Sequence, residues 1–211
     1  MNTYKMLVTV FVNGGFIFYI ILVSSILSFS IICFKVIEFF IKSRIKKKIF
    51  MEKLIEKIKD GKIKDAISFC DTEYSPIAEI SKIGLISLLD SNDEIDKILN
   101  REVMIQTFKL EKFVTVLGVI GNIIVYVGLL GTVLGIIKVF SSISLIGSND
   151  ISVVVGGVSE ALIATAASLL VAVPSTVAYN LFLRCINKFV FDMEWCVSLL
   201  EDLLKVNKSD V

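Results

Sequence analysis

The chain has no histidine, only 2 prolines, and 4 cysteines, none of which forms a C-x-x-C pair. Zinc centres are built from histidine and closely spaced cysteine ligands, so this composition argues against a metal site and predicts free, reduced thiols. The formal net charge is +1, so the chain lacks the positive excess that nucleic-acid binding requires. The sequence also offers no nucleophile–base set. We therefore predict no enzymatic activity, no cofactor and no nucleic-acid partner.

Apolar residues are abundant and gather into long runs. They make up 55% of the chain, and the mean hydropathy is +0.81. Apolar runs of about 18 or more residues are typical of membrane-spanning helices. Three such runs occur, at residues 14–41, 113–140 and 153–183. The sequence therefore predicts an all-α membrane protein with three transmembrane helices.

Most charged residues lie between the first two apolar runs, where apolar residues recur at helical spacing. This segment opens with the basic run KSRIKKK, residues 42–48. The positive-inside rule places such a run in the cytoplasm. A site for lipid headgroups is a second interpretation of it, and the topology signal is the simpler one. No helix breaker occurs between Glu94 and Gly118, which predicts a helix that continues unbroken into the second apolar run.

These observations give a predicted order of segments along the chain. Residues 1–13 lack the basic start and cleavage site of a signal peptide, so we expect them to be retained. The order is a periplasmic N-terminus (1–13), transmembrane helix 1 (14–41), a cytoplasmic helical domain (42–112), transmembrane helix 2 (113–140), a periplasmic loop (141–152), transmembrane helix 3 (153–183) and a cytoplasmic C-terminal helix (184–211).

The second and third apolar runs carry small residues in stripes. Gly121, Gly128 and Gly135 recur every seven residues, and Gly131 forms a G-x-x-x-G pair with Gly135. Small residues let helix backbones approach closely in lipid. Thr132 lies on the same side as Gly128 and Gly135. The third run has its own small and weakly polar stripe, formed by Ala161, Thr165, Ser168, Ala172 and Thr176.

The hydroxyls, the proline and the glutamate of these runs each have a functional and a purely structural interpretation. Hydroxyls such as those of Thr132 and Thr165 often bond only a carbonyl one turn back. Pro174 removes a backbone donor, and the freed carbonyl can kink the helix or accept a hydroxyl bond. Glu160 is an ionisable residue at membrane depth, which costs roughly 2–3 kcal/mol and marks a candidate functional site. Its structural alternative is an interfacial carboxyl that is protonated or hydrogen-bonded by a neighbouring helix.

The directions of Glu160 and Thr165 can be compared because both lie on one predicted helix. They are five residues apart, so at 100° per residue their side chains point about 140° apart. They cannot belong to one narrow stripe. We expect Glu160 to brace a contact between helices and Thr165 to face a cavity.

Two motifs on these runs resemble the MotA/TolQ/ExbB proton channel family, close to its TolQ and ExbB members. One is GLLGTVLG at residues 128–135, and the other is GVSEALIATA at residues 157–166, followed by Ala172-Val173-Pro174 and Tyr179-Asn180. Ser75-Pro76-Ile77-Ala78 also resembles the family. One departure stands out, because Ile124 and Val125 occupy positions where the family usually has Ala-Pro.

The resemblance implies a homopentamer around a pore in the bacterial inner membrane, with a periplasmic N-terminus and a cytoplasmic C-terminus. A small ExbD- or TolR-like subunit with one membrane span would carry the proton on its aspartate. Thr132 and Thr165 would then line the proton pathway, with Glu160 near them. A TonB- or TolA-like transducer would transmit the force.

Two classes of function remain open at this point. The leading one is an ExbB-like subunit that energises outer-membrane import of siderophores or cobalamin, with a TolQ-like role in the Tol-Pal system second. A flagellar stator subunit fits less well, since that branch usually has four spans. The other class is a non-conducting membrane scaffold whose glycines only pack helices.

Overall fold

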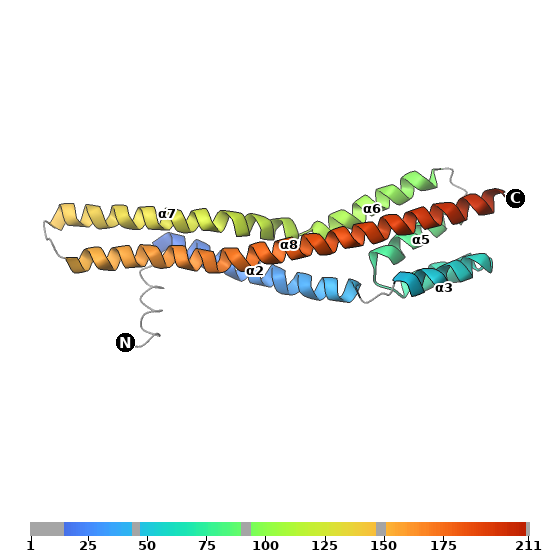
Figure 1. Cartoon of the computed structure of the whole chain (residues 1–211), viewed down its shortest axis with the longest axis horizontal. Coiled ribbons are helices and arrows are strands. Elements are labelled where there is room, and N and C mark those ends of the chain that lie inside the picture. The colour runs from blue at the N-terminus through green and yellow to red at the C-terminus, as the bar shows by residue number, and fades with distance from the viewer. Residues whose placement is uncertain (1–14, 44–46, 90–93, 147–150, 210–211) are drawn as a thin grey trace. The chain divides into compact units, whose positions relative to one another are not determined.

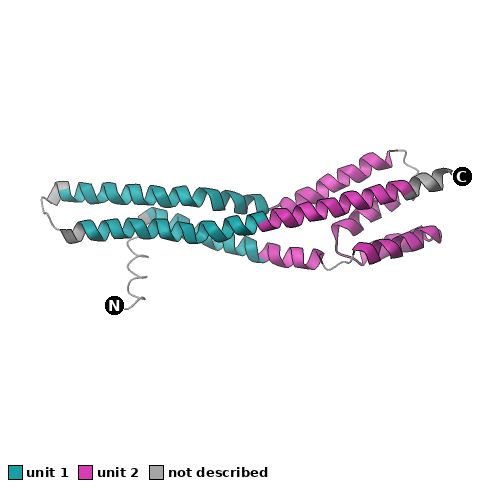
Figure 2. Ribbon diagram, viewed as in Figure 1, with its two compact units in different colours: residues 1–33, 113–180 teal, residues 34–112, 181–211 magenta. Residues whose placement is uncertain are grey.

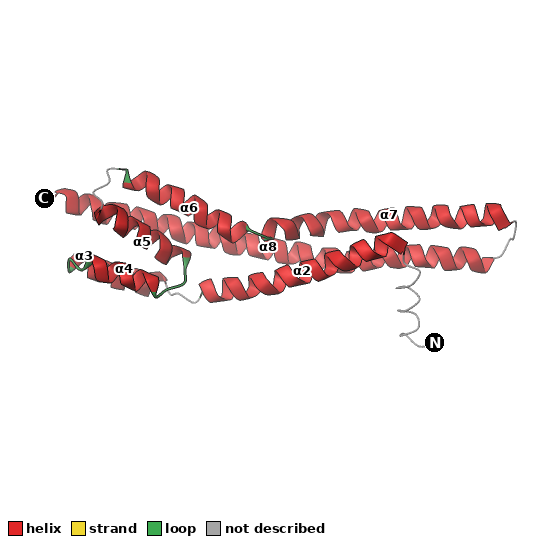
Figure 3. Ribbon diagram, turned by 180° about the vertical axis from the view of Figure 1, so that it is seen from behind, coloured by secondary structure: helices red, strands yellow, loops and turns green. Residues whose placement is uncertain are grey.

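The computed structural model describes residues 15–43, 47–89, 94–146 and 151–209. Within these ranges all regular structure is helical and no strand occurs (Figure 3). The helices, labelled as in Figure 1, are α2 (Gly15–Lys42), α3 (Lys47–Lys59), α4 (Ile63–Asp71), α5 (Pro76–Leu89), α6 (Ile95–Glu111), α7 (Val114–Ile146) and α8 (Ile151–Ser209). The expectation for residues 1–13 lies outside the described residues.

Three of these helices are long and apolar enough to cross a membrane, namely α2, α7 and α8. Four shorter helices lie between α2 and α7, and α8 continues well beyond its apolar part to Ser209. The predicted all-α fold class, with three membrane-length helices, a helical region between the first two and a helical C-terminal extension, is confirmed over the described residues. The membrane borders drawn from the sequence stay predictions.

The chain divides into two compact units, coloured separately in Figure 2. Unit 1 comprises residues 1–33 and 113–180, and unit 2 comprises residues 34–112 and 181–211. Unit 1 therefore holds the first part of α2, all of α7 and the first part of α8.

In unit 1, α7 and α8 form an antiparallel pair (Figures 1 and 3). The start of α2 joins them through a small core of Ile21, Ile124 and Ala172. Most other large apolar side chains of the unit are exposed, with Leu170 77% and Tyr126 69% exposed. Helices that are apolar all round and keep much of that surface exposed suit contact with lipid or with further helices.

Unit 2 has a conventional core in which α3, α4, α5 and the end of α8 meet. Leu54, Ala66, Leu85 and Leu200 are at most 1% exposed there. Gly61, between α3 and α4, has a φ of +71°, a left-handed conformation that glycine adopts without a steric cost.

The boundary between α6 and α7 contradicts the sequence prediction of an unbroken helix. α6 ends at Glu111 and α7 begins at Val114, with Phe113 between them at a φ of +68°. A left-handed conformation costs a non-glycine residue about 1–2 kcal/mol, so the break needs a compensating contact.

Lys35 of α2 supplies such a contact within unit 2. Its side chain is 1% exposed, and its Nζ donates a hydrogen bond to the Leu110 carbonyl oxygen at 3.0 Å. In an unbroken helix that carbonyl would accept from the Val114 N–H instead. A cation near the carboxyl end of α6 also interacts favourably with the helix dipole.

Candidate functional site

The contact between α7 and α8 is built from small residues, at positions where a larger side chain would clash. A Cβ atom added at Gly121 would lie 2.6 Å from the Thr176 Oγ1, and one added at Gly135 would lie 2.7 Å from the Ala161 Cβ. Real Cβ atoms essentially never come within 3.0 Å of such a neighbour. The glycines spaced by seven residues therefore allow the two helix backbones to approach closely.

Gly128 lies at a hydrogen-bonded point of this contact. Thr165 Oγ1, on α8, donates to the Gly128 carbonyl oxygen at 2.8 Å. Ser168, which is fully buried, donates its hydroxyl to the Thr165 carbonyl at 2.8 Å. A Cβ at Gly128 would overlap the Ser168 hydroxyl and would lie 3.2 Å from the Thr165 Cα. The absence of a side chain at Gly128 is what lets the Thr165 hydroxyl reach α7.

Two other hydroxyls in unit 1 donate to a carbonyl about one turn back on their own helix, which is the structural interpretation that the sequence left open. Thr132 donates to the Leu129 carbonyl three residues back at 2.6 Å, and Ser175 donates to the Val171 carbonyl at 2.6 Å. Hydroxyls that bond back to their own helix need no functional explanation. Thr165 differs from Thr132 because its hydroxyl donates to another helix. Ser175 also makes a contact between helices, since its hydroxyl oxygen lies 2.5 Å from the hydroxyl oxygen of Ser28 on α2.

Gly131 and Pro174 lie at different places in the helix pair. A Cβ at Gly131 would lie 3.2 Å from Ile17 Cγ2 of α2 and 3.3 Å from Ala164 Cβ of α8, so this glycine faces both neighbours. Pro174 is exposed and lies inside α8, which continues through it. The adjacent Ser175 hydroxyl bonds the Val171 carbonyl rather than the Leu170 carbonyl that a proline at position 174 frees.

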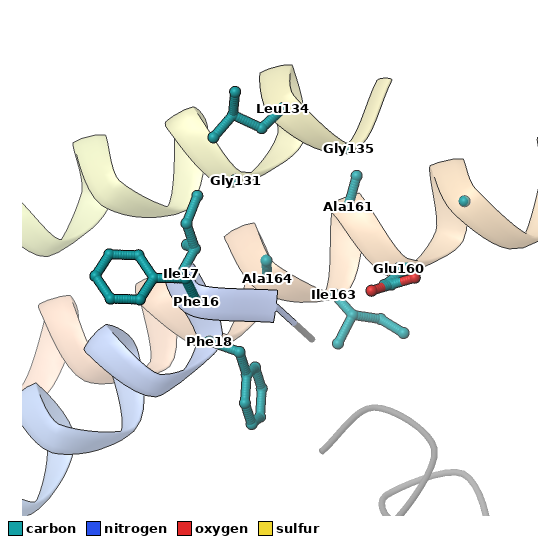
Figure 4. A pocket seen from close by; sticks show the side chains of 11 residues that line it. Phe16, Ile17, Phe18, Gly131, Leu134, Gly135, Glu160, Ala161, Ile163 and Ala164 are labelled. Atoms are coloured by element: carbon teal, nitrogen blue, oxygen red, sulfur yellow. The ribbon is translucent and has the colours of Figure 1, made fainter. Parts of the chain in front are cut away.

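Glu160 lines a cavity of about 220 Å³ within unit 1. Figure 4 shows its carboxylate beside Ile163 of α8, with other lining residues supplied by the start of α2 and by α7. The walls are formed by Phe16, Ile17, Phe18, Gly131, Leu134, Gly135, Gly157, Ala161, Ile163 and Ala164. Glu160 is thus the single ionisable residue among the lining residues.

The Glu160 side chain is half-buried and has no hydrogen-bond or ion-pair partner among the described residues. The orientations of Glu160 and Thr165 are the reverse of the sequence prediction. Glu160 faces the cavity, whereas Thr165 makes the contact between helices. A carboxyl that stands unpaired at membrane depth is costly and is therefore a candidate for function.

Within the described ranges, no group of three or more histidine, cysteine, aspartate or glutamate side chains lies close enough to hold a metal ion.

The positions where the family usually has Ala-Pro lie inside an unbroken α7. Ile124 is 2% exposed there and packs in the core of unit 1.

The three long apolar helices are those of a multi-pass membrane protein. Residues 73–195, more than half of the chain, match the MotA/TolQ/ExbB proton channel family. The chain belongs to this family.

Curated relatives agree with this assignment. A biopolymer transport protein ExbB from Xanthomonas campestris pv. campestris (strain B100) is 40% identical over 105 residues, which cover 50% of this chain and 42% of the relative. ExbB from Aquifex aeolicus (strain VF5) is 37% identical over 102 residues, covering 44% of this chain and 69% of the relative. The Tol-Pal system protein TolQ from Pseudomonas aeruginosa PAO1 is 42% identical over 74 residues, covering 35% and 32%. The chain spans less than half of the Xanthomonas and Pseudomonas relatives that it matches.

Proposed function

We propose that this chain is a proton-channel subunit of the bacterial inner membrane that uses the proton motive force to energise a TonB-type transducer for outer-membrane import. The observation that carries the proposal is the Glu160 carboxyl in an otherwise apolar cavity lined by membrane-length helices, where it has no hydrogen-bond or ion-pair partner among the described residues. Family membership and relatives named ExbB support it. In this assembly the N-terminus is periplasmic and the C-terminus cytoplasmic.

The working form is a homopentamer around a pore that holds an ExbD- or TolR-like subunit. The exposed apolar surface of α7 and α8 supports this part of the proposal, since a single chain leaves it uncovered. α6 adds exposed apolar residues outside the three apolar helices, with Met104 71% and Phe108 75% exposed. Exposed apolar groups outside the lipid region suit contact with further protein copies.

In this mechanism the proton is carried by an aspartate of the partner subunit, and this chain supplies polar groups along its path. Glu160 offers a carboxyl that can take up or release a proton. Thr165 donates its hydroxyl hydrogen to Gly128, but a hydroxyl oxygen keeps acceptor capacity for water or a partner group. The same holds for Thr132, whose hydrogen bond is to Leu129.

Proton flux into liposomes tests the role of Glu160. The chain is co-purified with its one-span partner, reconstituted, and compared with Glu160→Gln, which keeps the size and polarity of the side chain. Glu194→Gln is the matched control, because Glu194 lies on the same helix and is exposed. We expect flux to fall to the level of empty liposomes for Glu160→Gln and to be unchanged for Glu194→Gln. Full flux in Glu160→Gln, with an intact complex, would support the non-conducting scaffold instead.

Thr165 needs a test that separates packing from proton transfer. Thr165→Val removes the bond to Gly128, which costs about 0.6 kcal/mol by the average for such bonds in membrane helices. Thr165→Ser keeps the hydroxyl. A pathway role predicts that flux is lost in the valine variant and retained in the serine variant, while both still assemble. If the valine variant conducts normally, Thr165 only packs the helices.

The similarity to TolQ supports a second candidate, a subunit of the Tol-Pal envelope system. The two candidates share the channel and differ in the transducer. Purification from native membranes in mild detergent, with mass spectrometry of the complex, distinguishes them. A TonB-like protein in the complex favours import, and a TolA-like protein favours the envelope role.

A further inference from the structure

A second cavity, of about 250 Å³, lies in unit 2, where the apolar part of α2 ends. We call it the basic pocket because three lysines line it. Its polar lining consists of Lys42, Ser43, Lys47, Ser75, Lys188 and Asp192. None of these residues belongs to the candidate proton pathway.

The pocket carries more positive than negative charge. Asp192 is the acidic residue among its lining residues, and its carboxylate accepts a hydrogen bond from Lys47. Lys42 Nζ is held by Glu38 at 2.6 Å. Lys188 is exposed and has no hydrogen-bond or ion-pair partner among the described residues.

The paired lysines can still bind an anion. An ammonium group has three donors, and the ion pairs with Glu38 and Asp192 use one donor each from Lys42 and Lys47. These ion pairs also fix the two ammonium groups before any ligand arrives. Ser75 accepts a hydrogen bond from the Ile77 N–H at 3.3 Å, which leaves its own hydroxyl hydrogen for a ligand.

The surroundings of the pocket combine a buried apolar wall with exposed apolar side chains. Its apolar wall includes Phe39, which is 6% exposed and stacks on Phe189 with ring centroids 6.0 Å apart. Exposed apolar residues lie on the same stretches of α2 and α8, with Phe40 63% and Leu181 56% exposed. An anionic ligand with apolar chains can therefore place its charge in the pocket and its chains along the helices.

From these contacts we propose that the basic pocket binds the phosphodiester headgroup of an anionic phospholipid. Basic pockets between membrane helices are known to hold such headgroups. At about 250 Å³, the cavity is below the roughly 300–1,000 Å³ of sites that enclose a whole drug-sized ligand, which suits a headgroup whose chains stay outside. The inference requires only that the chain spans a membrane, and it stands whether or not the chain conducts protons.

Lipid retention by the full chain tests the proposal. The purified chain in detergent is stripped of lipid and titrated with phosphatidylglycerol or with phosphatidylcholine of the same acyl chains. Native mass spectrometry counts the lipids bound at each concentration. We expect selective retention of phosphatidylglycerol. Lys188→Gln should weaken it about fivefold, the value for losing one lysine near an anionic lipid, and Lys188→Arg should restore it.

Lys48→Gln is the matched control, since Lys48 is an exposed lysine next to Lys47 that does not line the pocket. Its affinity for phosphatidylglycerol should be unchanged. The proposal is overturned if both lipids are retained equally, or if Lys48→Gln loses as much affinity as Lys188→Gln. Displacement of the lipid by inorganic phosphate, against chloride at equal ionic strength, would assign the pocket to a soluble anion.

Discussion

Replacing Gly128 with alanine tests how closely α7 and α8 must approach. The added Cβ would overlap the Ser168 hydroxyl and lie 3.2 Å from the Thr165 Cα, a backbone atom that cannot rotate away. The helices therefore have to separate. That movement would lengthen the 2.8 Å bond from Thr165 to the Gly128 carbonyl.

The cost of Gly128→Ala follows from two contributions. Overpacking of a tight contact costs about 1–3 kcal/mol, and the weakened interhelical hydrogen bond adds up to about 0.6 kcal/mol. For a chain of this size, 1 kcal/mol shifts the melting temperature by about 2–4 °C. Alanine favours a helix over glycine at any helical position, so the cost is measured against a glycine-to-alanine change elsewhere in a helix. We therefore expect the melting temperature of Gly128→Ala in detergent to lie roughly 2–14 °C below that of Gly156→Ala.

Gly156→Ala is the control for this measurement. Gly156 also lies in an apolar helix, but a Cβ there would meet nothing within 4 Å. The substitution should be neutral or should raise stability by up to about 1 kcal/mol, because alanine favours a helix over glycine. Ser168→Gly should partly rescue Gly128→Ala by removing the atoms that clash. Equal melting temperatures for the two alanine variants would refute the argument that close packing at Gly128 is required.

Three further predictions test unit 2 and its boundary by thermal denaturation. Burial raises the pKa of the Cys70 thiol from 9.0 to about 12, so between these values the folded chain keeps a proton that the unfolded chain loses. Stability should therefore fall as the pH rises above about 9, and Cys70→Ala should make that fall shallower; an unchanged slope would contradict this. Lys35→Met should lower the free energy of unfolding by about 1.5–3 kcal/mol, the value of a hydrogen bond to a charged group. Lys97→Met, which removes an exposed ion pair, should lower it by at most about 0.5 kcal/mol. Equal losses would be evidence against a compensating role for Lys35. Phe113→Gly relieves about 1–2 kcal/mol of backbone strain. It should therefore destabilise the chain less than Phe108→Gly, which puts glycine inside α6 at a cost of about 1 kcal/mol. The reverse order of stabilities would show that no strain is stored at Phe113.

The fold class could be predicted because it depends on the length and period of apolar runs. A run of about 20 apolar residues has few stable alternatives to a membrane helix, since its backbone groups must be satisfied internally. The same reasoning fails for the end of α6. Nothing in the local sequence breaks the helix there, and the contact that compensates for the break comes from Lys35, 75 residues away from Leu110. Helix propensity depends on neighbouring residues, so it cannot predict a contact with a residue so far away in the sequence.

The orientation of the candidate site shows where sequence reasoning stopped short. Helical geometry fixes the angle between Glu160 and Thr165 at about 140°, but it does not say which of the two faces the neighbouring helix. That direction depends on where α7 presents its glycines. Thr165 belongs to the small-residue stripe of the third apolar run, and stripes of small residues stabilise a membrane protein by letting neighbouring helices pack closely. Thr165 should therefore lie in the contact and Glu160 outside it, which is the arrangement observed. The orientation of the two side chains could therefore be predicted from the stripes of small residues, but not from Glu160 and Thr165 considered alone.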